Sequence, residues 1–204
     1  MQTTPTPGHG AVGAQQEGQR LLEAAVAAMH GGDEAASEEL LRRSIEAAPV
    51  NPTAHYLLGA EYAQRKQYGD AIIHWTTAVE QAPATGIARL QLGLLWLTLA
   101  NPTAALLQLE PLGQLGADDP LRHFGIGLSC LCRDDLPGAA AGLSSGLRLE
   151  TANLALAADM QRVLSAVDER IRGAGASHPM TEGPLSASLG MAISAYAGYT
   201  PGGG

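Results

Sequence analysis

The sequence predicts an all-α protein built as a superhelix of about four antiparallel helix pairs, closed by a capping helix. Two observations predict this fold class. Residues of matching size recur at a step of 34 positions, and turn-forming residues fall once in each step. A third observation agrees with them. Aromatic residues are few, with a single phenylalanine, so the core must come from aliphatic side chains on closely approaching helices.

Five sets of positions carry the 34-residue period. The sets are Ala25, Gly59, Gly93 and Gly127; Ala24, Leu58, Leu92 and Ile126; Ala28, Tyr62, Trp96 and Cys130; Ser37, Ala71, Ala105 and Ala139; and Leu41, Trp75, Leu109 and Leu143. The small residues let the two helices of a unit approach closely, and the large ones fill the space between successive units. Because no unit can bury its own apolar face alone, stacking of the units supplies the core.

The second unit resembles the tetratricopeptide repeat. Its Leu58-Gly59 and Tyr62, followed by Ala71, Trp75 and Pro83, match the pattern L-G-x-x-Y, A-x-x-x-F, P of that family. The resemblance covers residues 18–153 as four units, with a further helix over 153–172. In the third unit Ala117 stands where the family has proline. Pro120 is the alternative residue at which the second helix of this unit ends.

The chain divides into three parts. Residues 1–17 are predicted to be disordered, 18–172 to form the repeat domain with its cap helix, and 173–204 to form a flexible tail rich in Gly, Ala and Ser. Within the tail, residues 184–197 have one apolar helical face, and we expect either a short docked helix or a disordered segment. Turns are predicted at residues 31–33, 68–70, 101–103 and 134–137.

The formal charge of −8 argues against nucleic acid as a partner, because phosphate binding needs a basic surface. No stretch reaches the ~18 apolar residues of a membrane span, and the first residues lack the features of a secretory signal. The single lysine, Lys66, against eleven arginines resembles the codon bias of a GC-rich bacterium. We therefore expect a bacterial protein that is soluble and cytoplasmic. Two cysteines are too few for a disulfide framework, which agrees with that compartment.

Several short motifs suggest chemistry but fit the repeat better. Residues 142–146 match G-x-S-x-G, yet Leu143 belongs to a repeat set inside a helix. Gly31 to Glu34 resembles part of a nucleotide-cyclase motif but lies at a turn. Cys130 and Cys132 point in nearly opposite directions on a helix, so they cannot bind one metal ion together. No pair of histidines has the spacing of metal ligands on a helix. We expect no catalytic residue, no cofactor, no metal site and no enzymatic activity.

The resemblance implies that the first helix of each unit lines a concave face that binds protein. All positions implied for this groove are uncharged, and all but Tyr56 are fully apolar. They are Leu22, Val26, Met29, Tyr56, Ala60, Ala63, Leu90, Leu94, Leu97, Phe124, Leu128 and Leu131. The expected occupant is an apolar peptide or amphipathic helix of another protein. The alternative is that tight curvature buries these side chains against one another or against the cap helix.

This pattern resembles the translocator chaperones of type III secretion, which implies a chaperone that holds an apolar segment of its partner. The alternative function is a structural adaptor in a secretion, pilus or envelope assembly. Self-association into a homo-oligomer is a further expectation for either function.

Overall fold

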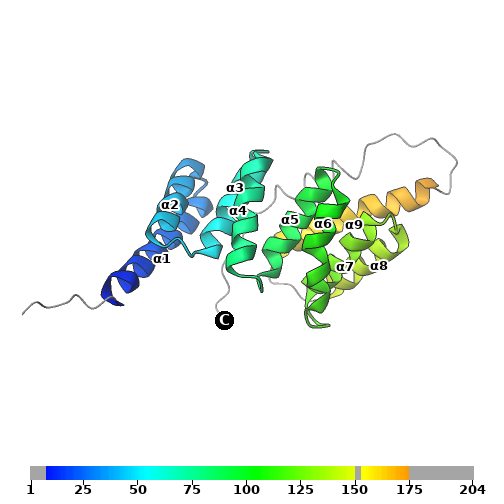
Figure 1. The fold of residues 1–204 in the computed structure, drawn as a ribbon. Coiled ribbons are helices and arrows are strands. Elements are labelled where there is room, and N and C mark those ends of the chain that lie inside the picture. Colours follow the sequence, from blue (N-terminus) through cyan, green and yellow to red (C-terminus); the bar gives the residue numbers. More distant parts are fainter. Residues whose placement is uncertain (1–7, 150–152, 175–204) are drawn as a thin grey trace, which may run out of the picture.

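The computed structural model describes residues 8–149 and 153–174, and every regular element in these ranges is a helix (Figure 1). The all-α prediction is therefore confirmed. The elements are α1 (Gly8–His30), α2 (Glu34–Ala47), α3 (Pro52–Gln64), α4 (Tyr68–Gln81), α5 (Gly86–Thr98), α6 (Pro102–Leu109), the 3₁₀ helix η1 (Glu110–Gln114), α7 (Pro120–Cys132), α8 (Leu136–Arg148) and α9 (Leu154–Ala174).

The helix starts repeat the sequence period. The first helices of successive units, α3, α5, α7 and α9, begin at residues 52, 86, 120 and 154. The second helices, α2, α4, α6 and α8, begin at residues 34, 68, 102 and 136. Both series advance by 34 residues, so α9 stands where the first helix of a fifth unit would be. It serves as the cap that ends the stack.

The turn inside each unit has one conformation, repeated four times. Gly32, Lys66, Ala100 and Asp134 have positive φ angles of 74°, 60°, 55° and 58°, and they too lie 34 residues apart. The amide of the following residue donates to the carbonyl five positions back, as from Asn101 to Trp96 at 2.8 Å. A left-handed residue with this hydrogen bond is a common helix ending.

Two predicted turns are therefore misplaced. Of residues 101–103 only Asn101 precedes α6, and the left-handed turn residue is Ala100. Residues 68–70 form the first turn of α4, and the chain reverses at Lys66 and Gln67 instead. The sequence was misleading here because the left-handed position is held by lysine, whereas Gly69, the expected turn residue, lies inside the helix.

Two further boundaries differ from expectation. Helix α1 begins at Gly8, within the segment 1–17 for which disorder was predicted; Ala, Gln and Glu there are compatible with a helix. In the third unit, α6 gives way to η1 at Glu110, and Pro120 starts α7 rather than ending the preceding helix. Pro111 is tolerated in the first turn of η1, because a backbone N–H there would have no partner within the helix. The predicted tail helix lies outside the described residues.

Close helix approach depends on the glycines. A Cβ on Gly59 would lie 2.6 Å from the ring of Trp75, whose indole is fully buried and donates to the Tyr56 carbonyl at 3.0 Å. A Cβ on Gly142 would lie 2.6 Å from the Cα of Gly127. The G-x-S-x-G segment thus lies inside α8 as the contact face toward α7, as the repeat predicted.

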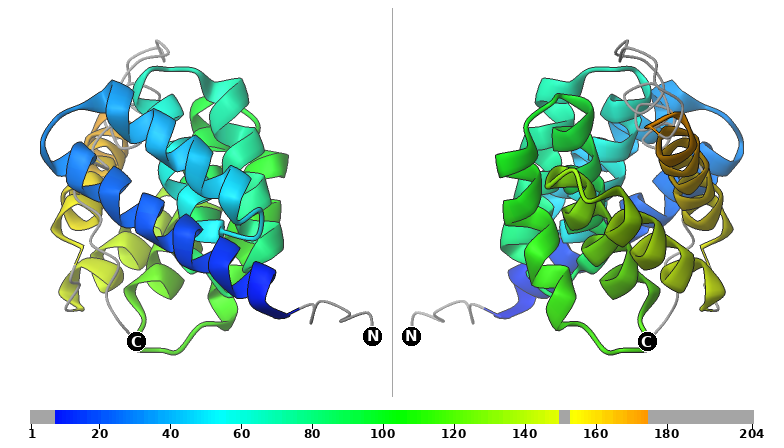
Figure 2. Two further views of the ribbon diagram at one scale, coloured as in Figure 1. Left: turned by 90° about the vertical axis from the view of Figure 1, so that its left-hand side faces the viewer. Right: turned by 90° about the vertical axis from the view of Figure 1, so that its right-hand side faces the viewer.

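The stack of helix pairs is curved along its length. Figure 2, which looks along it from either end, shows α9 on one side of the molecule and the second helices α4 and α6 toward the other. The apolar residues of α9, including Leu156, Met160 and Val163, belong to the same buried cluster as those of α3, α5 and α7. The described part of the chain therefore shares one continuous core.

Candidate functional site

The structure buries most of the residues predicted to line a groove. Exposed fractions are zero for Leu90, Leu94, Phe124 and Leu128, and below one tenth for the others in this set: Leu22, Tyr56, Ala60, Ala63 and Leu131. Only Val26, Met29 and Leu97 are half-buried. An open apolar groove along all four units is thus not what this structure presents, and a binding role for the buried residues stays a prediction.

The physical reason lies in the curvature and the cap. Leu90, Leu94, Phe124 and Leu128 are in one cluster with α9 side chains, so packing among the units and the cap removes them from water. This outcome is the alternative that the sequence left open. Among the described residues, the solvent-accessible part of the concave face lies mainly in the first unit, at Val26 and Met29.

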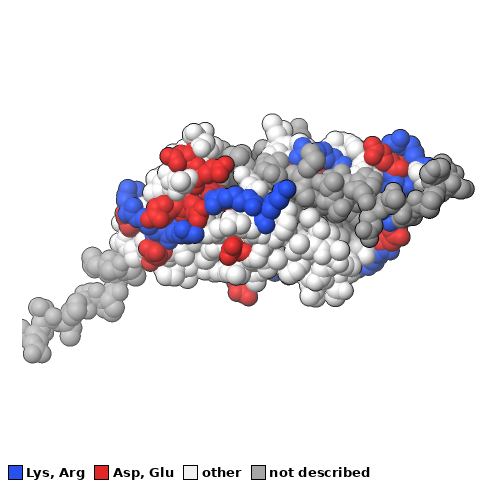
Figure 3. Space-filling view, turned by 90° about the horizontal axis from the view of Figure 1, so that it is seen from above, with Lys and Arg blue, Asp and Glu red and all other residues white. Residues whose placement is uncertain are grey.

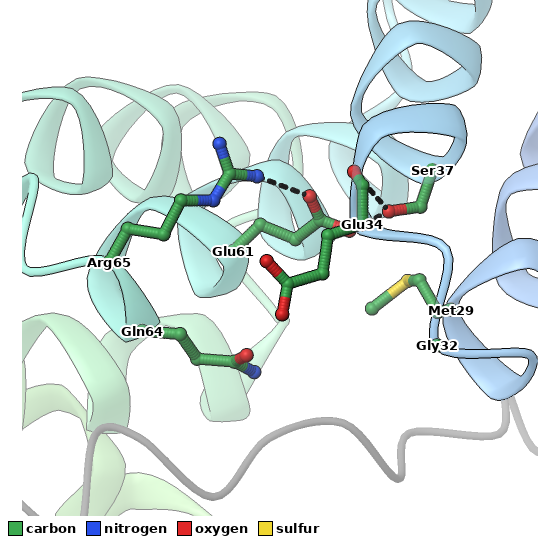
Figure 4. A pocket seen from close by; sticks show the side chains of 7 residues that line it. All are labelled: Met29, Gly32, Glu34, Ser37, Glu61, Gln64 and Arg65. Carbon is green, nitrogen blue, oxygen red and sulfur yellow. Dashed lines mark hydrogen bonds and ion pairs between the residues drawn. The ribbon is translucent and has the colours of Figure 1, made fainter.

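A cavity of about 120 Å³ lies beside Met29, where α1, α2 and α3 meet. Its lining combines one thioether, one hydroxyl, two carboxylates, an amide and a guanidinium. The lining residues are Met29, Gly32, Glu34, Ser37, Glu61, Gln64 and Arg65. Figure 4 shows the side chains of Met29, Glu34 and Gln64 reaching into the open space from three different segments. The cavity thus joins an apolar wall to polar groups at one end of the concave face.

The far wall of the cavity is a network of hydrogen bonds and ion pairs. Ser37 donates its hydroxyl proton to the buried carboxylate of Glu61, and Arg65 donates to the same carboxylate at 2.8 Å. Arg65 also pairs with Glu38, which pairs in turn with Arg42. Burial raises the pKa of Glu61, while Ser37 and Arg65 oppose that rise.

Sequence analysis missed this network, although the repeat held a signal for it. Ser37 is the one hydroxyl residue in a set whose other members are alanine. The residue that faces it from the next unit is Glu61, and the corresponding pair one unit later is Ala71 and the fully buried Leu95. The equivalent pairs further along are Ala105 with Ser129 and Ala139 with Val163, so a charged residue occurs in this pair only at the first boundary.

A second missed feature is a histidine pair beside the network. The Nδ1 atoms of His55 and His74 lie 3.0 Å apart, so one ring donates and the other accepts. Tyr62 stacks on His74 and accepts a hydrogen bond from Arg42 at 2.7 Å. Burial lowers the pKa of both histidines, and for His74 the neighbouring His55 lowers it further. The pair is therefore favoured in its neutral form.

The pair should make the fold less stable in acid. A folded-state pKa below the unfolded value means that stability is present above the ordinary pKa of ~6.5 and is lost as the pH falls. His55→Leu copies Leu21, which fills the same position in unit one. We expect the melting temperature of this variant to rise relative to that of the wild type as the pH falls from 7.5 to 5. A constant difference across that range would contradict the assignment.

The described residues contain no group of three or more His, Cys, Asp or Glu side chains placed to hold a metal ion. Burial raises the pKa of the Cys132 thiol to about 11, and burial also raises that of Cys130. Neither thiol is activated as a nucleophile. Over the same residues, no helix has both the length and the apolar character needed to cross a bilayer.

Charge is distributed unevenly along the stack. Between Asp70 and Glu110 the only charged residues are Glu80 and Arg89. Figure 3 shows the charged side chains gathered mainly over the two ends, with a largely uncharged surface between them. On this middle stretch Ile73 and Leu107, 34 residues apart, are 62% and 68% exposed on the second helices. The cavity at Met29 lies in the charged end.

Comparison with known proteins supports the fold. No protein-family model matches the sequence, and no curated protein matches it either. Among solved structures, a MamA RS-1 ArsTM double mutant matches with a TM-score of 0.57 and 13% identity, over 87% of this chain and 92% of that chain. MamA from Desulfovibrio magneticus RS-1 (residues 41 to the end) matches with a TM-score of 0.55 and 15% identity, over 92% and 95%. The fold is thus a tetratricopeptide-like helical repeat.

Proposed function

We propose that this chain is a non-enzymatic protein-binding scaffold that holds a segment of another polypeptide against the concave side of its first two units. The observation that carries the proposal is the accessible cavity beside Met29, next to half-buried Val26. Of the other apolar side chains predicted for this side, only Leu97 is half-buried, and the rest are buried in the core. An apolar surface flanked by polar groups is typical of sites that bind protein segments.

The repeat fold agrees with this proposal, since stacked helix pairs present extended surfaces that suit polypeptide partners. Either a chaperone for an apolar segment or an adaptor in a larger assembly would use such a surface. The identity of the partner separates these two roles. A chaperone should bind one aggregation-prone protein, whereas an adaptor should bind components of one assembly.

Partner capture with matched variants tests the proposal. The full chain is used to capture proteins from the lysate of the source organism, followed by mass spectrometry. The test variant is Val26→Glu/Met29→Glu, and the control is Ile73→Glu/Leu107→Glu, which places the same charges on exposed apolar positions of the second helices. We expect the test variant to lose the captured partner and the control to retain it, because desolvated apolar contacts dominate such interfaces.

Circular dichroism of both variants shows whether the helices are retained. A folded test variant that captures the same partner as the wild type would contradict a site at Met29. The predicted groove residues Leu94 and Leu128 are unsuitable test positions, because both are fully buried and a charge there would disrupt the core.

A further inference from the structure

The charge around the cavity beside Met29 is unbalanced. Two carboxylates line it, Glu34 and Glu61, together with a single guanidinium, that of Arg65. Arg65 is already engaged by Glu61 and by Glu38, which lies just behind it. Arg42 is in turn engaged by Glu38 and by Tyr62. Together with Glu34, which lines the cavity, the cluster has three carboxylates, those of Glu34, Glu38 and Glu61, against two guanidinium groups.

Glu34 supplies the unbalanced charge. Among the described residues its carboxylate forms no ion pair, although its charge acts on the Arg65 guanidinium. Its backbone carbonyl shares the Ser37 hydroxyl proton with the Glu61 carboxylate. The side chain extends into the cavity between Gln64 and Met29 (Figure 4). A carboxylate, an amide oxygen and a thioether thus converge on one space. That combination suits an ammonium or guanidinium head carried on an aliphatic stem.

We propose that this cavity receives a basic side chain, lysine or arginine, of the polypeptide that the scaffold binds. The head pairs with the Glu34 carboxylate and hydrogen-bonds the amide oxygen of Gln64, while the stem lies along Met29. This inference rests on the proposed function and names the chemistry of its partner. The partner segment accordingly combines apolar residues with a basic residue, in line with the net charge of −8 of this chain.

The repeat supports a binding role for the polar pair of Ser37 and Glu61 rather than a purely structural one. One unit later, the positions of Ser37 and Glu61 hold Ala71 and Leu95, which pack with no exposed surface. The stack can therefore be built without any carboxylate at this boundary. Burying Glu61 costs desolvation free energy that the apolar pair avoids.

Methionine-methyl NMR on the full chain tests the proposal. The chain has five methionines, and Met29→Leu identifies the Met29 signal. The probes are the tripeptide amides acetyl-Ala-Lys-Ala, acetyl-Ala-Arg-Ala and the uncharged acetyl-Ala-norleucine-Ala. We expect a saturable shift of the Met29 methyl with the lysine or arginine peptide, weakened by added salt, and a much smaller one with norleucine. The Met160 methyl, fully buried in α9, should not move.

Two variants sharpen the test. Glu34→Gln changes only an exposed charge and should weaken the response to the basic peptides at least tenfold. Ser37→Ala/Glu61→Leu copies the next unit boundary and should also weaken it. Equal responses to lysine and norleucine, or none to either basic peptide, would overturn the inference. If partner capture still depends on Val26 and Met29 while Glu34→Gln captures normally, the scaffold function stands and the basic-residue pocket does not.

Discussion

Replacing Gly142 with alanine should destabilise the protein by about 3 kcal/mol or more, as overpacking of backbone against backbone cannot relax through a rotamer change. A Cβ at this position would lie 2.6 Å from the Cα and 2.7 Å from the amide nitrogen of Gly127. Gly127→Ala should act similarly, because its Cβ would lie 2.8 Å from the Leu143 amide nitrogen. Helices α7 and α8 would have to separate to admit either methyl group.

Urea unfolding followed by circular dichroism at 222 nm measures this effect. Gly69→Ala is the matched control, since that glycine also lies in a helix and a Cβ there meets nothing within 4 Å. We expect the control to be neutral or more stable by about 0.5–1 kcal/mol, from the better helix propensity of alanine. If the Gly142→Ala variant unfolded at the same urea midpoint as the wild type, α7 and α8 would not cross at their glycines.

Replacing Asp159 with asparagine should stabilise the cap helix at alkaline pH. The Asp159 side chain has no exposed surface, its Oδ1 atom pairs with Arg162, and its Oδ2 atom has no hydrogen-bond partner among the described residues. Burial raises the pKa of this carboxyl to about 7, although Arg162 acts in the opposite direction. The folded state therefore favours the protonated, neutral acid.

The direction of the pH effect follows from this raised pKa. Stability from the neutral carboxyl is fully present below the unfolded pKa near 4 and is lost as the pH rises through about 7. At pH 8 the ionised carboxylate costs up to about 4 kcal/mol, which the asparagine variant avoids. The variant and the wild type should differ little at pH 4.

Unfolding measured at pH 4, 6 and 8 checks this expectation. Asp168→Asn, on the exposed side of the same helix α9, is the control and should show no comparable gain at pH 8. An Asp159→Asn variant that is less stable than the wild type at pH 8 would mean that the Arg162 ion pair outweighs the desolvation of Asp159, and the assignment would be wrong.

The sequence by itself determined the helical class and the repeat, because both depend on local periodicity and side-chain size. The sets containing Gly59, Trp75 and Gly127 predicted which helix faces meet, and the structure confirms close contact at those residues. The Asn-Pro-Thr-Ala segments at residues 51 and 101 start α3 and α6, where each asparagine side chain accepts from the amide three residues on. Such caps act within one turn of chain and are readable without tertiary information.

Other features depended on contacts between units. The same repeat position holds Leu57, Gln91, Gly125 and Asp159, and nothing in the sequence distinguishes a buried polar residue there from an exposed one. Both Gln91 and Asp159 are fully buried. The pairing of His55 with His74 likewise joins two helices, and their spacing in the chain follows no motif.

Only the tertiary structure decided which part of the concave face is accessible. Curvature is the sum of small rotations between successive units, so it depends on every side chain packed at each boundary. The resulting curvature and the packing of α9 together bury Leu90, Leu94 and Phe124 in the core. At the first boundary the polar pair of Ser37 and Glu61 replaces an apolar one, and a cavity beside Met29 stays open there.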